Sequence, residues 1–188
     1  MIALWNRLFG RSRPDDPVAR CYARIVAQAR RPEFYSAWGV PDTLDGRFDM
    51  LALHAFLVVH RLKRQGEPAR RFSRHLFEFM ITDMDRSMRE MGIGDMGVAP
   101  RVKAMAKGFN GRIHAYDHGI DSEDGDSALL AALDNNLYGT VLKTDPAALT
   151  GMAAYLRRGV ALLAEQPLEP LLAGEVDFPE PPVPEPAP

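Results

Sequence analysis

The amino-acid sequence predicts an all-α protein: a single globular domain of about six or seven helices, followed by a proline-rich tail. In segment after segment, apolar residues recur at intervals of three and four, which is the spacing of an amphipathic helix. Two Asp-Pro pairs, Asp16-Pro17 and Asp145-Pro146, each provide an N-cap followed by a proline at the first helical position. No segment alternates apolar and polar residues with the period of two that is typical of a strand.

The chain divides into three parts by composition. Residues 1–13 form a short basic amphipathic leader, residues 14–165 the helical domain, and residues 166–188 an acidic tail rich in proline. Repeated prolines oppose regular structure, so we expect the tail to be extended and disordered. The net charge of −2 gives no indication of a specific nucleic-acid partner. The single cysteine, Cys21, excludes an internal disulfide and suits a reducing compartment such as the cytoplasm.

The leader has the composition of a segment that lies at a membrane interface. Its sequence is MIALWNRLFGRSR, in which apolar residues such as Trp5 can share one face while Arg7 and Arg11 add positive charge. Two interpretations stay open: peripheral contact with a membrane, or a terminus that is frayed or docked on the domain. The longest uncharged apolar run, residues 50–60, is too short to span a bilayer.

The first half of the domain contains a helix that begins at Asp16-Pro17 and ends near Pro32. A turn-rich connection follows over residues 41–46, in which Thr43 or Asp45 can cap the next helix. That helix, residues 47–64, is apolar on nearly every side, which predicts a central, buried position. Its two histidines are six residues apart, so they do not form an i, i+4 metal pair and are expected to be core or rim residues.

The middle of the chain holds two amphipathic helices joined by a glycine turn. The first, residues 72–91, carries an apolar stripe that is rich in methionine, and Gly92 is placed to end it as the C′ residue. The glycines of this turn match the GxGxxG spacing, but a helix rather than a strand precedes them, which favours a turn over a nucleotide site. Pro100 is expected to begin the second helix, whose apolar stripe runs to Tyr116.

Two aspartates in the first of these helices cannot act as a pair. Asp83 and Asp85 are two residues apart and therefore point in nearly opposite directions on a helix. Asp85 faces outward with Arg89, whereas Asp83 lies at the edge of the apolar stripe and requires a partner because an unpaired buried charge is costly. We predict that the partner of Asp83 is Arg112 or Arg47.

The remaining segments continue the helical pattern. Residues 117–126 are acidic and read as a solvated loop, because their order does not match a calcium loop. A helix is expected over residues 127–138, ending at Gly139, and another begins at Asp145-Pro146. The proline-rich tail starts at residue 166.

Motifs of catalysis are missing from the sequence. It contains no GxSxG, no HExxH and no Walker loop. The acidic run DMDRSMRE could belong to a magnesium-diphosphate site, but such sites need aspartates that converge from two helices, and only one such run occurs. We therefore predict no catalytic residue, no metal site and no cofactor.

Methionines concentrated in the middle of the chain provide the positive indication of function. Their flexible side chains adapt to varied apolar partners, although by periodicity alone most of them are expected in the core. We predict an apolar groove between the helices at residues 72–91 and 100–116, exposing a contiguous apolar patch. The candidate client-binding residues are Phe79, Met80, Met84, Met88, Met91, Met96, Met105 and Phe109.

Four ordered blocks resemble the ubiquinol-cytochrome c chaperone family, the assembly factors of the cytochrome bc1 complex. The blocks are AxxPxFY from Ala29, VPDTxDGRFD from Val40, TDMDRSMREMGIGDMGV from Thr82 and FNGRIHAY from Phe109. The resemblance covers roughly residues 22–163, and the short leader resembles that of a bacterial member. The positions that match the family signature are Pro41, Asp42, Thr43, Gly46, Arg47, Asp83, Asp85, Arg89, Glu90, Gly92, Gly94, Asp95, Gly111, Arg112 and Tyr116.

The resemblance implies a non-enzymatic helical chaperone that binds newly synthesised cytochrome b and supports biogenesis of the bc1 complex. In mitochondria the family works with a small accessory subunit, and the resemblance leaves open whether this chain needs one. Two alternatives come from other classes: a helical enzyme that handles isoprenoids or quinones, with a closed pocket and several convergent acids, or a generic helical adaptor whose proline tail binds a partner.

Overall fold

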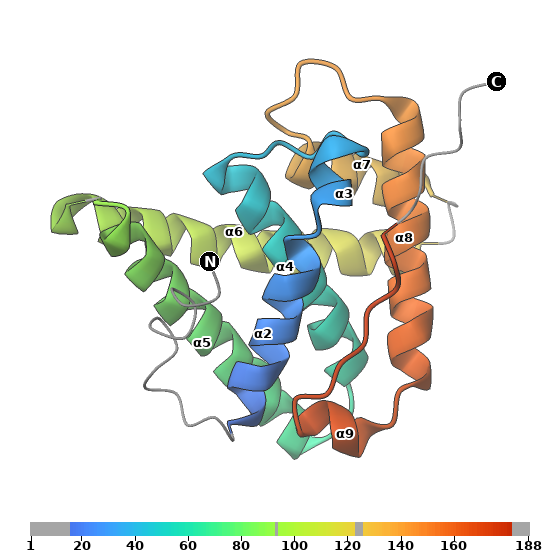
Figure 1. Ribbon diagram of the computed structural model, residues 1–188. Coiled ribbons are helices and arrows are strands. Elements are labelled where there is room, and N and C mark those ends of the chain that lie inside the picture. The colour runs from blue at the N-terminus through green and yellow to red at the C-terminus, as the bar shows by residue number, and fades with distance from the viewer. Residues whose placement is uncertain (1–15, 93, 123–125, 182–188) are drawn as a thin grey trace.

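The computed structural model describes residues 16–92, 94–122 and 126–181, and every regular element among them is a helix (Figure 1). This confirms the all-α class. The leader predicted over residues 1–13 lies outside the described residues. Six helices have at least 11 residues and two have five. In chain order they are α2 Pro17–Ala29, α3 Pro32–Ser36, α4 Leu44–Leu62, α5 Glu67–Glu90, α6 Asp95–Asp121, α7 Ser127–Leu137, α8 Pro146–Glu165 and α9 Leu168–Leu172.

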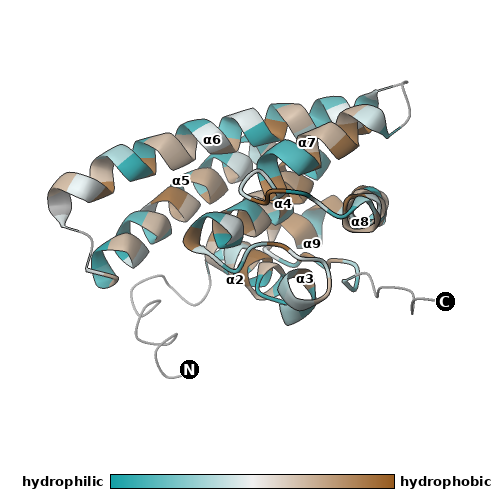
Figure 2. Ribbon diagram, turned by 90° about the horizontal axis from the view of Figure 1, so that it is seen from above, coloured by the Kyte–Doolittle hydropathy of each residue, from teal (hydrophilic) through white to brown (hydrophobic). Residues whose placement is uncertain are grey.

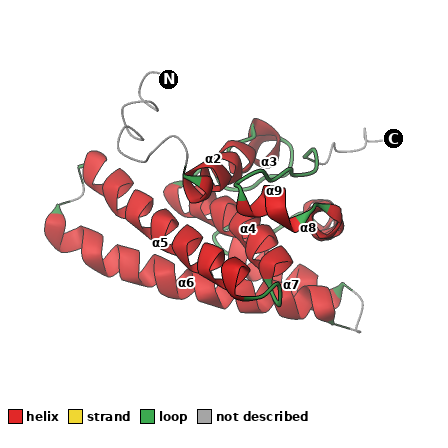
Figure 3. Cartoon of the chain, turned by 90° about the horizontal axis from the view of Figure 1, so that it is seen from below, coloured by secondary structure: helices red, strands yellow, loops and turns green. Residues whose placement is uncertain are grey.

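Helix α4 lies at the centre of the fold, as its apolar sequence predicts. It packs against α2, α5, α6, α7 and α8, and the side chains of Leu53, Phe56 and Leu57 are completely buried. Helices α5 and α6 form a long hairpin whose tip extends away from the other helices (Figure 1). Figure 2 shows hydrophobic and hydrophilic residues interleaved along both, as expected for helices with one buried and one solvent-facing side. Figure 3 shows the same hairpin from below.

Local sequence signals set most of the helix ends. The side chains of Asp16, Thr43 and Asp145 accept hydrogen bonds from backbone N–H groups in the first turns of α2, α4 and α8, at 2.9, 3.1 and 2.9 Å. Gly92 follows α5 with a φ of +80°, the left-handed conformation of a C′ glycine. The cap of α4 is thus Thr43, and the three predicted helix starts are confirmed to within a few residues.

Helix α6 begins earlier than predicted. It starts at Asp95, so Pro100 lies inside the helix and not at its first position. A proline there lacks the N–H that would bond the carbonyl four residues before it, yet the helix continues through this gap. The prediction failed because Pro100 was taken as a start signal, whereas the residues before it complete the first turn of α6.

The C-terminal segment differs most from its prediction. Residues 166–181, expected to belong to a disordered tail, form α9 and then an extended segment that lies along α2. The carbonyl of Ala173 accepts hydrogen bonds from Arg20 at 2.6 and 3.1 Å, and the carbonyl of Pro179 accepts one from Gln28 at 2.8 Å. Prolines lack N–H donors but keep their carbonyl acceptors, and α2 presents donors at one-turn intervals. Residues 182–188 lie outside the described residues.

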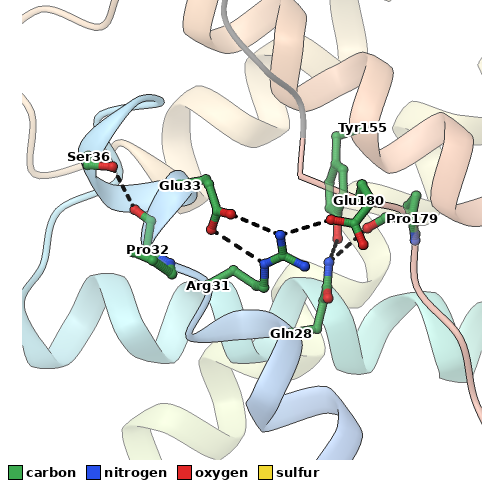
Figure 4. Close-up of polar contacts among 8 residues, drawn as sticks. All are labelled: Gln28, Arg31, Pro32, Glu33, Ser36, Tyr155, Pro179 and Glu180. Atoms are coloured by element: carbon green, nitrogen blue, oxygen red, sulfur yellow. Dashed lines mark hydrogen bonds and ion pairs between the residues drawn. The ribbon is translucent and has the colours of Figure 1, made fainter.

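Charged groups secure the end of this segment. Arg24 forms an ion pair with Asp177 at 3.1 Å. Arg31 forms ion pairs with both Glu33 and Glu180, at 2.9 and 2.8 Å (Figure 4). We call residues 173–181 the C-terminal strap. It ties the end of the chain to the start of the domain, so the helical domain continues well past residue 165.

A chain of hydrogen bonds crosses the core beneath the strap. Gln28 donates to the hydroxyl of Tyr155 at 2.9 Å, and that hydroxyl lies 2.8 Å from Nε2 of the buried His54 (Figure 4 shows Gln28 and Tyr155). Nδ1 of His54 lies 2.8 Å from the carbonyl of Met50, which can only accept. Burial lowers the pKa of His54 and keeps the ring neutral, so it donates from Nδ1 to this carbonyl and accepts at Nε2 from Tyr155. The prediction of a core histidine is confirmed.

The buried His54 should make folding sensitive to acid. Burial lowers its pKa from 6.5 to about 4. Between these values the unfolded chain binds more protons than the folded one, so stability is lost as the pH falls from about 6.5 towards 4. We expect the stability difference between the parent and His54→Gln to change by on the order of 3 kcal/mol across this interval. Urea unfolding at a series of pH values tests this, and parallel curves for the two proteins would contradict it.

Candidate functional site

The candidate site is an apolar groove of about 200 Å³ bounded by α2, α4 and α5. Its apolar lining comes from these three helices and from one residue of α6, and consists of Val26, Ala29, Leu44, Phe48, Leu51, Met84, Met88, Met91 and Met105. Tyr22, Arg30, Tyr35, Arg47 and Ser87 complete the lining. No carboxylate belongs to it among the described residues. We call this site the apolar groove.

One end of the apolar groove is open to solvent. Leu44 and Met91, which line this end, are 43% and 55% exposed. Met96, in the first turn of α6, is 95% exposed and lies just beyond the turn that follows Met91. Three large apolar side chains are thus exposed near the tip of the α5–α6 hairpin or at the adjoining start of α4. Another exposed one, Leu142, lies in the α7–α8 connection and does not line the groove.

The structure divides the predicted client-binding residues. Met84, Met88, Met91 and Met105 line the apolar groove. Met80 and Phe109 are buried in the core and do not line the groove. Met84 and Met88 line it but are buried as well, so only Met91 and the partly buried Met105 are open to a client in this conformation. Phe79 is partly buried, with its ring centroid 5.2 Å from that of Tyr22. Met96 is exposed but does not line the groove.

The position of the predicted groove is wrong. We expected it between the two helices of the hairpin, but these pack directly against each other. The rings of Phe77 on α5 and Phe109 on α6 are stacked, with centroids 5.3 Å apart. The groove lies instead on the side of α5 that faces α2 and α4. Helical periodicity shows which side of α5 is apolar, but it does not show which neighbour covers each part of that side.

Asp83 does have a partner, but it is not an arginine. The hydroxyl of Tyr22 on α2 donates a hydrogen bond to its Oδ2 at 2.9 Å. Burial and the nearby carboxylate both raise the pKa of Tyr22, so the phenol keeps its proton. The two predicted partners are engaged elsewhere: Arg47 pairs with Asp42 at 2.6 Å, and Arg112 with Asp49. Since Tyr22 lines the apolar groove, this bond fixes one of its walls.

Asp49 is a supporting residue of the site that was not among the predicted site residues. It is 8% exposed on α4 and forms an ion pair with Arg112 of α6, whose guanidinium lies 5.2 Å from the ring centroid of Phe48. Burial raises the pKa of Asp49 to about 6, and the charge of Arg112 opposes this rise. Phe48 lines the apolar groove, so the pair supports a second wall. A signal was present, because Asp49 is the only acid between Asp45 and Glu67 in an otherwise apolar helix.

Several signature positions shape the connection before α4. A Cβ on Gly46 would lie 2.0 Å from the carbonyl oxygen of Pro41, so only glycine fits there. Thr43 caps α4, and the exposed pair of Asp42 and Arg47 spans the same turn. Together these residues hold the start of α4, and with it Leu44, at the mouth of the groove.

The remaining signature positions lie on the α5–α6 hairpin. Asp85 and Arg89 form an exposed i, i+4 ion pair at 2.6 Å. Exposed positions near the tip are Glu90, Gly92 and Gly94. Further along α6, Gly111 is exposed and Tyr116 is fully buried, while Asp95 is the first residue of that helix. These positions maintain the hairpin and do not converge on one site.

The described part of the chain has neither a candidate metal site nor a candidate membrane-spanning helix. No group of three His, Cys, Asp or Glu residues there could hold a metal ion. None of the described helices combines the length and the hydropathy needed to cross a bilayer. His60 bonds Asp117 at 2.7 Å at the rim of the core, and His114 and His118 are exposed.

Comparisons with known proteins agree with this architecture. The family model of the ubiquinol-cytochrome C chaperone matches residues 36–178, which includes most of the C-terminal strap. Ubiquinol-cytochrome-c reductase complex assembly factor 1 of Xenopus laevis is 31% identical over 158 residues, covering 84% of this chain and 78% of the frog protein. The Mus musculus protein of the same name is 29% identical over 158 residues, and the match covers 84% of this chain and 52% of the mouse protein.

A solved structure extends the likeness to the fold. The crystal structure of the Cbp3 homolog from Brucella abortus is 36% identical in sequence and superposes with a TM-score of 0.77, covering 96% of this chain and 97% of that one. The family model, the two relatives and the solved structure are consistent with one another. The chain belongs to the ubiquinol-cytochrome c chaperone family.

Proposed function

We propose that this chain is an assembly chaperone for ubiquinol-cytochrome c reductase, and that it holds newly synthesised cytochrome b through the apolar groove. Membership of the family supports the role in assembly, since the frog and mouse relatives are named as assembly factors of that complex. The groove supports the mode of binding. The observation that carries the proposal is the exposure of Leu44 and Met91 at the open end of a groove lined by four methionines.

The chemistry of the apolar groove suits part of a transmembrane segment. Before insertion, such a segment exposes apolar side chains to water, and covering them is favourable by about 25 cal/mol per Å². Methionine side chains are unbranched and polarizable, so the exposed Met91 and the partly buried Met105 can adjust to clients of different shape, while Met84 and Met88 form the buried part of the lining. Binding at the open end would be reversible, as a chaperone requires.

The two alternatives lack comparable support. A quinone- or isoprenoid-handling enzyme of the kind considered above needs several acids that converge on its pocket, whereas the lining of the apolar groove contains none among the described residues. An adaptor that binds through its proline tail needs that tail to be free. In the part of this tail that the structure describes, residues 173–181 are instead engaged by donors of α2. We therefore propose a non-enzymatic function.

Site-specific crosslinking tests the proposal. A photoreactive amino acid is placed at Leu44, Met91 or Leu142 in separate variants, each present while cytochrome b is synthesised in a cell-free system. All three positions are exposed and apolar, but only Leu44 and Met91 line the apolar groove. We expect crosslinks to cytochrome b from these two and not from Leu142. Crosslinks from Leu142 alone, or turnover of a quinone by the purified protein, would overturn the proposal.

We also propose a peripheral position at the membrane into which the client is inserted. The basic amphipathic composition of residues 1–13, which lie outside the described residues, supports such contact. A small accessory subunit is a further candidate partner, by analogy with mitochondrial members. Co-purification of the tagged chain from its native host would test for it.

A further inference from the structure

Positive charge is concentrated where α4 ends and α5 begins. Residues 61–75 contain six arginines and lysines and one acid, Glu67, in a chain whose net charge is −2. We call the exposed members of this set the cationic end: Lys63, Arg64, Arg70, Arg71 and Arg74. These clustered cations create a positive electrostatic potential at a surface that is separate from the apolar groove.

Much of this charge is not neutralised by the protein. Lys63 pairs with Asp117 at 2.9 Å and Arg70 with Glu67 at 2.7 Å. For Arg64, Arg71 and Arg74, no acidic side chain within 4.0 Å is found in the described part of the chain. Three guanidinium groups therefore face solvent and are available to an anionic partner.

The backbone at Arg64 shows that a cation is kept there against the local conformational preference. Lys63 has φ −56° and ψ 128°, Arg64 has φ +66°, and the N–H of Gln65 bonds the carbonyl of Leu62 at 3.2 Å. These values match a type II turn, in which the third residue is favoured to be glycine. Among the described residues, Arg64 is the only non-glycine with a positive φ. Folding alone would favour glycine at this position, which makes Arg64 a candidate for a role in binding.

A cleft of about 440 Å³ lies beside these cations and combines two kinds of lining. Val59, Leu62 and Ile113 contribute apolar side chains. Lys63, Arg64, Arg70 and Arg74 contribute positive charge, and Ser73 adds a hydroxyl group. The lining also includes one acid, Asp117, which is paired with Lys63 and His60. The chemistry that matches such a lining is an anionic amphiphile, with a phosphate near the guanidinium groups and the first methylene groups of an acyl chain against the apolar residues.

We propose that the cationic end docks on the headgroup surface of a bilayer that contains anionic phospholipid, with one lipid phosphate in this cleft. The first described residues of α2, to which the basic leader is joined, lie at the same end of the molecule, the lower end in Figure 1.

This orientation leaves the apolar groove uncovered. Leu44 begins α4 and Met91 caps α5, so both lie at the ends of these helices that are remote from the cationic end. Helix α5 has 24 residues, which corresponds to a length of about 36 Å. The open end of the groove would therefore point to the aqueous side, from which a newly synthesised chain arrives. The inference deepens the membrane contact proposed above by naming the surface responsible.

An RNA partner fits the cationic end less well. Sites for single-stranded RNA pair cations with exposed aromatic rings on which bases stack. The nearby Phe72 is buried, and the only ring in the lining of the cleft is that of His60, which is engaged with Asp117. The apolar lining of the cleft can pack against the acyl chain of a lipid, whereas the sugar-phosphate backbone of RNA offers no apolar group of this kind.

Vesicle sedimentation with the full chain tests the proposal. The probes are vesicles of phosphatidylcholine alone and of phosphatidylcholine mixed with phosphatidylglycerol, and the test variant replaces Arg64, Arg71 and Arg74 with glutamine. Each cation near an anionic surface strengthens binding roughly fivefold, so the triple variant should bind the mixed vesicles about two orders of magnitude more weakly. Neither protein should bind the neutral vesicles strongly.

Two controls separate this surface from overall charge and from misfolding. Replacing Arg101, Lys103 and Lys107 with glutamine removes the same charge from exposed positions of α6 and should leave binding nearly unchanged. The single variant Arg64→Gly should bind the mixed vesicles roughly fivefold more weakly while melting at the same or a higher temperature.

Three outcomes would overturn the proposal. The two triple variants could lose vesicle binding equally, or the variant at Arg64, Arg71 and Arg74 could bind the mixed vesicles as well as the parent does. The parent could also bind RNA through these three arginines and fail to bind the vesicles. The assay contains no client. Its failure would therefore leave the proposed chaperone function standing, and failure of the crosslinking experiment would leave this inference standing.

Discussion

Replacing Arg112 with methionine is expected to lower the free energy of unfolding by about 3–5 kcal/mol, among the largest effects of any single substitution in this chain. The reason is Asp49, which is buried on α4 and has Arg112 as its ion-pair partner. Methionine retains much of the packing against Phe48 but leaves a carboxylate without compensation in the core. Urea unfolding at pH 7 measures the loss.

The dependence of this loss on pH identifies its cause. The pKa of Asp49 is already raised to about 6 by burial, and removing Arg112 should raise this pKa further. A folded-state pKa above the unfolded value means that the folded protein binds more protons, so stability falls as the pH rises. The variant should therefore be most destabilised near neutral pH and should recover part of its stability towards pH 5.

Arg89→Met is the matched control. It breaks the ion pair with Asp85, which is exposed, and should cost no more than about 0.5 kcal/mol. A second comparison combines Arg112→Met with Asp49→Leu, which removes both charges and should restore most of the stability. Arg112→Met could lower the free energy of unfolding no more than Arg89→Met does, or its effect could be independent of pH. Either result would show that the ion pair of Asp49 and Arg112 does not stabilise the fold as we infer.

Local sequence accounts for most of the helix ends, and α6 is the exception: it begins before Pro100, and residues 117–121, expected in a loop, form its last turn. Asp16, Thr43 and Asp145 act within their own first turns, and Gly92 within its own turn. Residues 48–58 of α4 are apolar on nearly every side, and this favours the central place of that helix because water is excluded from all sides there. Signals of this kind act between residues that are at most four or five positions apart, so they can be recognised in the sequence alone.

Contacts between residues that are distant in the sequence could not be predicted. Asp83 required a partner, but nothing local distinguishes the hydroxyl of Tyr22, 61 positions away, from an arginine. The same holds for the C-terminal strap, whose prolines have no helical or strand pattern and whose order depends on the donors of α2. Met80 and Met88 share one stripe with Met84 and Met91, yet only packing decides which of them lines the apolar groove.

Introducing charge at the mouth of the apolar groove should abolish most client binding while leaving the fold intact. In the double variant Leu44→Glu and Met91→Glu, both positions are about half exposed, so the glutamates can remain solvated and the free energy of unfolding should change little. Completing the burial of two such side chains on a client is worth about 2 kcal/mol, roughly thirtyfold in affinity. Desolvation of the two carboxylates against an apolar segment adds to this loss.

The measurement is the yield of cytochrome b that co-purifies with the tagged chaperone after cell-free synthesis, with circular dichroism to verify the fold. Leu142→Glu is the control, because it places one of the same charged groups on an exposed apolar position that does not line the groove, and each single groove variant is compared with it at equal charge. Binding lost in both proteins would mean that added negative charge alone repels the client. Binding retained in the double variant would mean that the client is held elsewhere on the chain, and the buried positions Met80 and Phe109 would then bind it only if the α5–α6 hairpin opened.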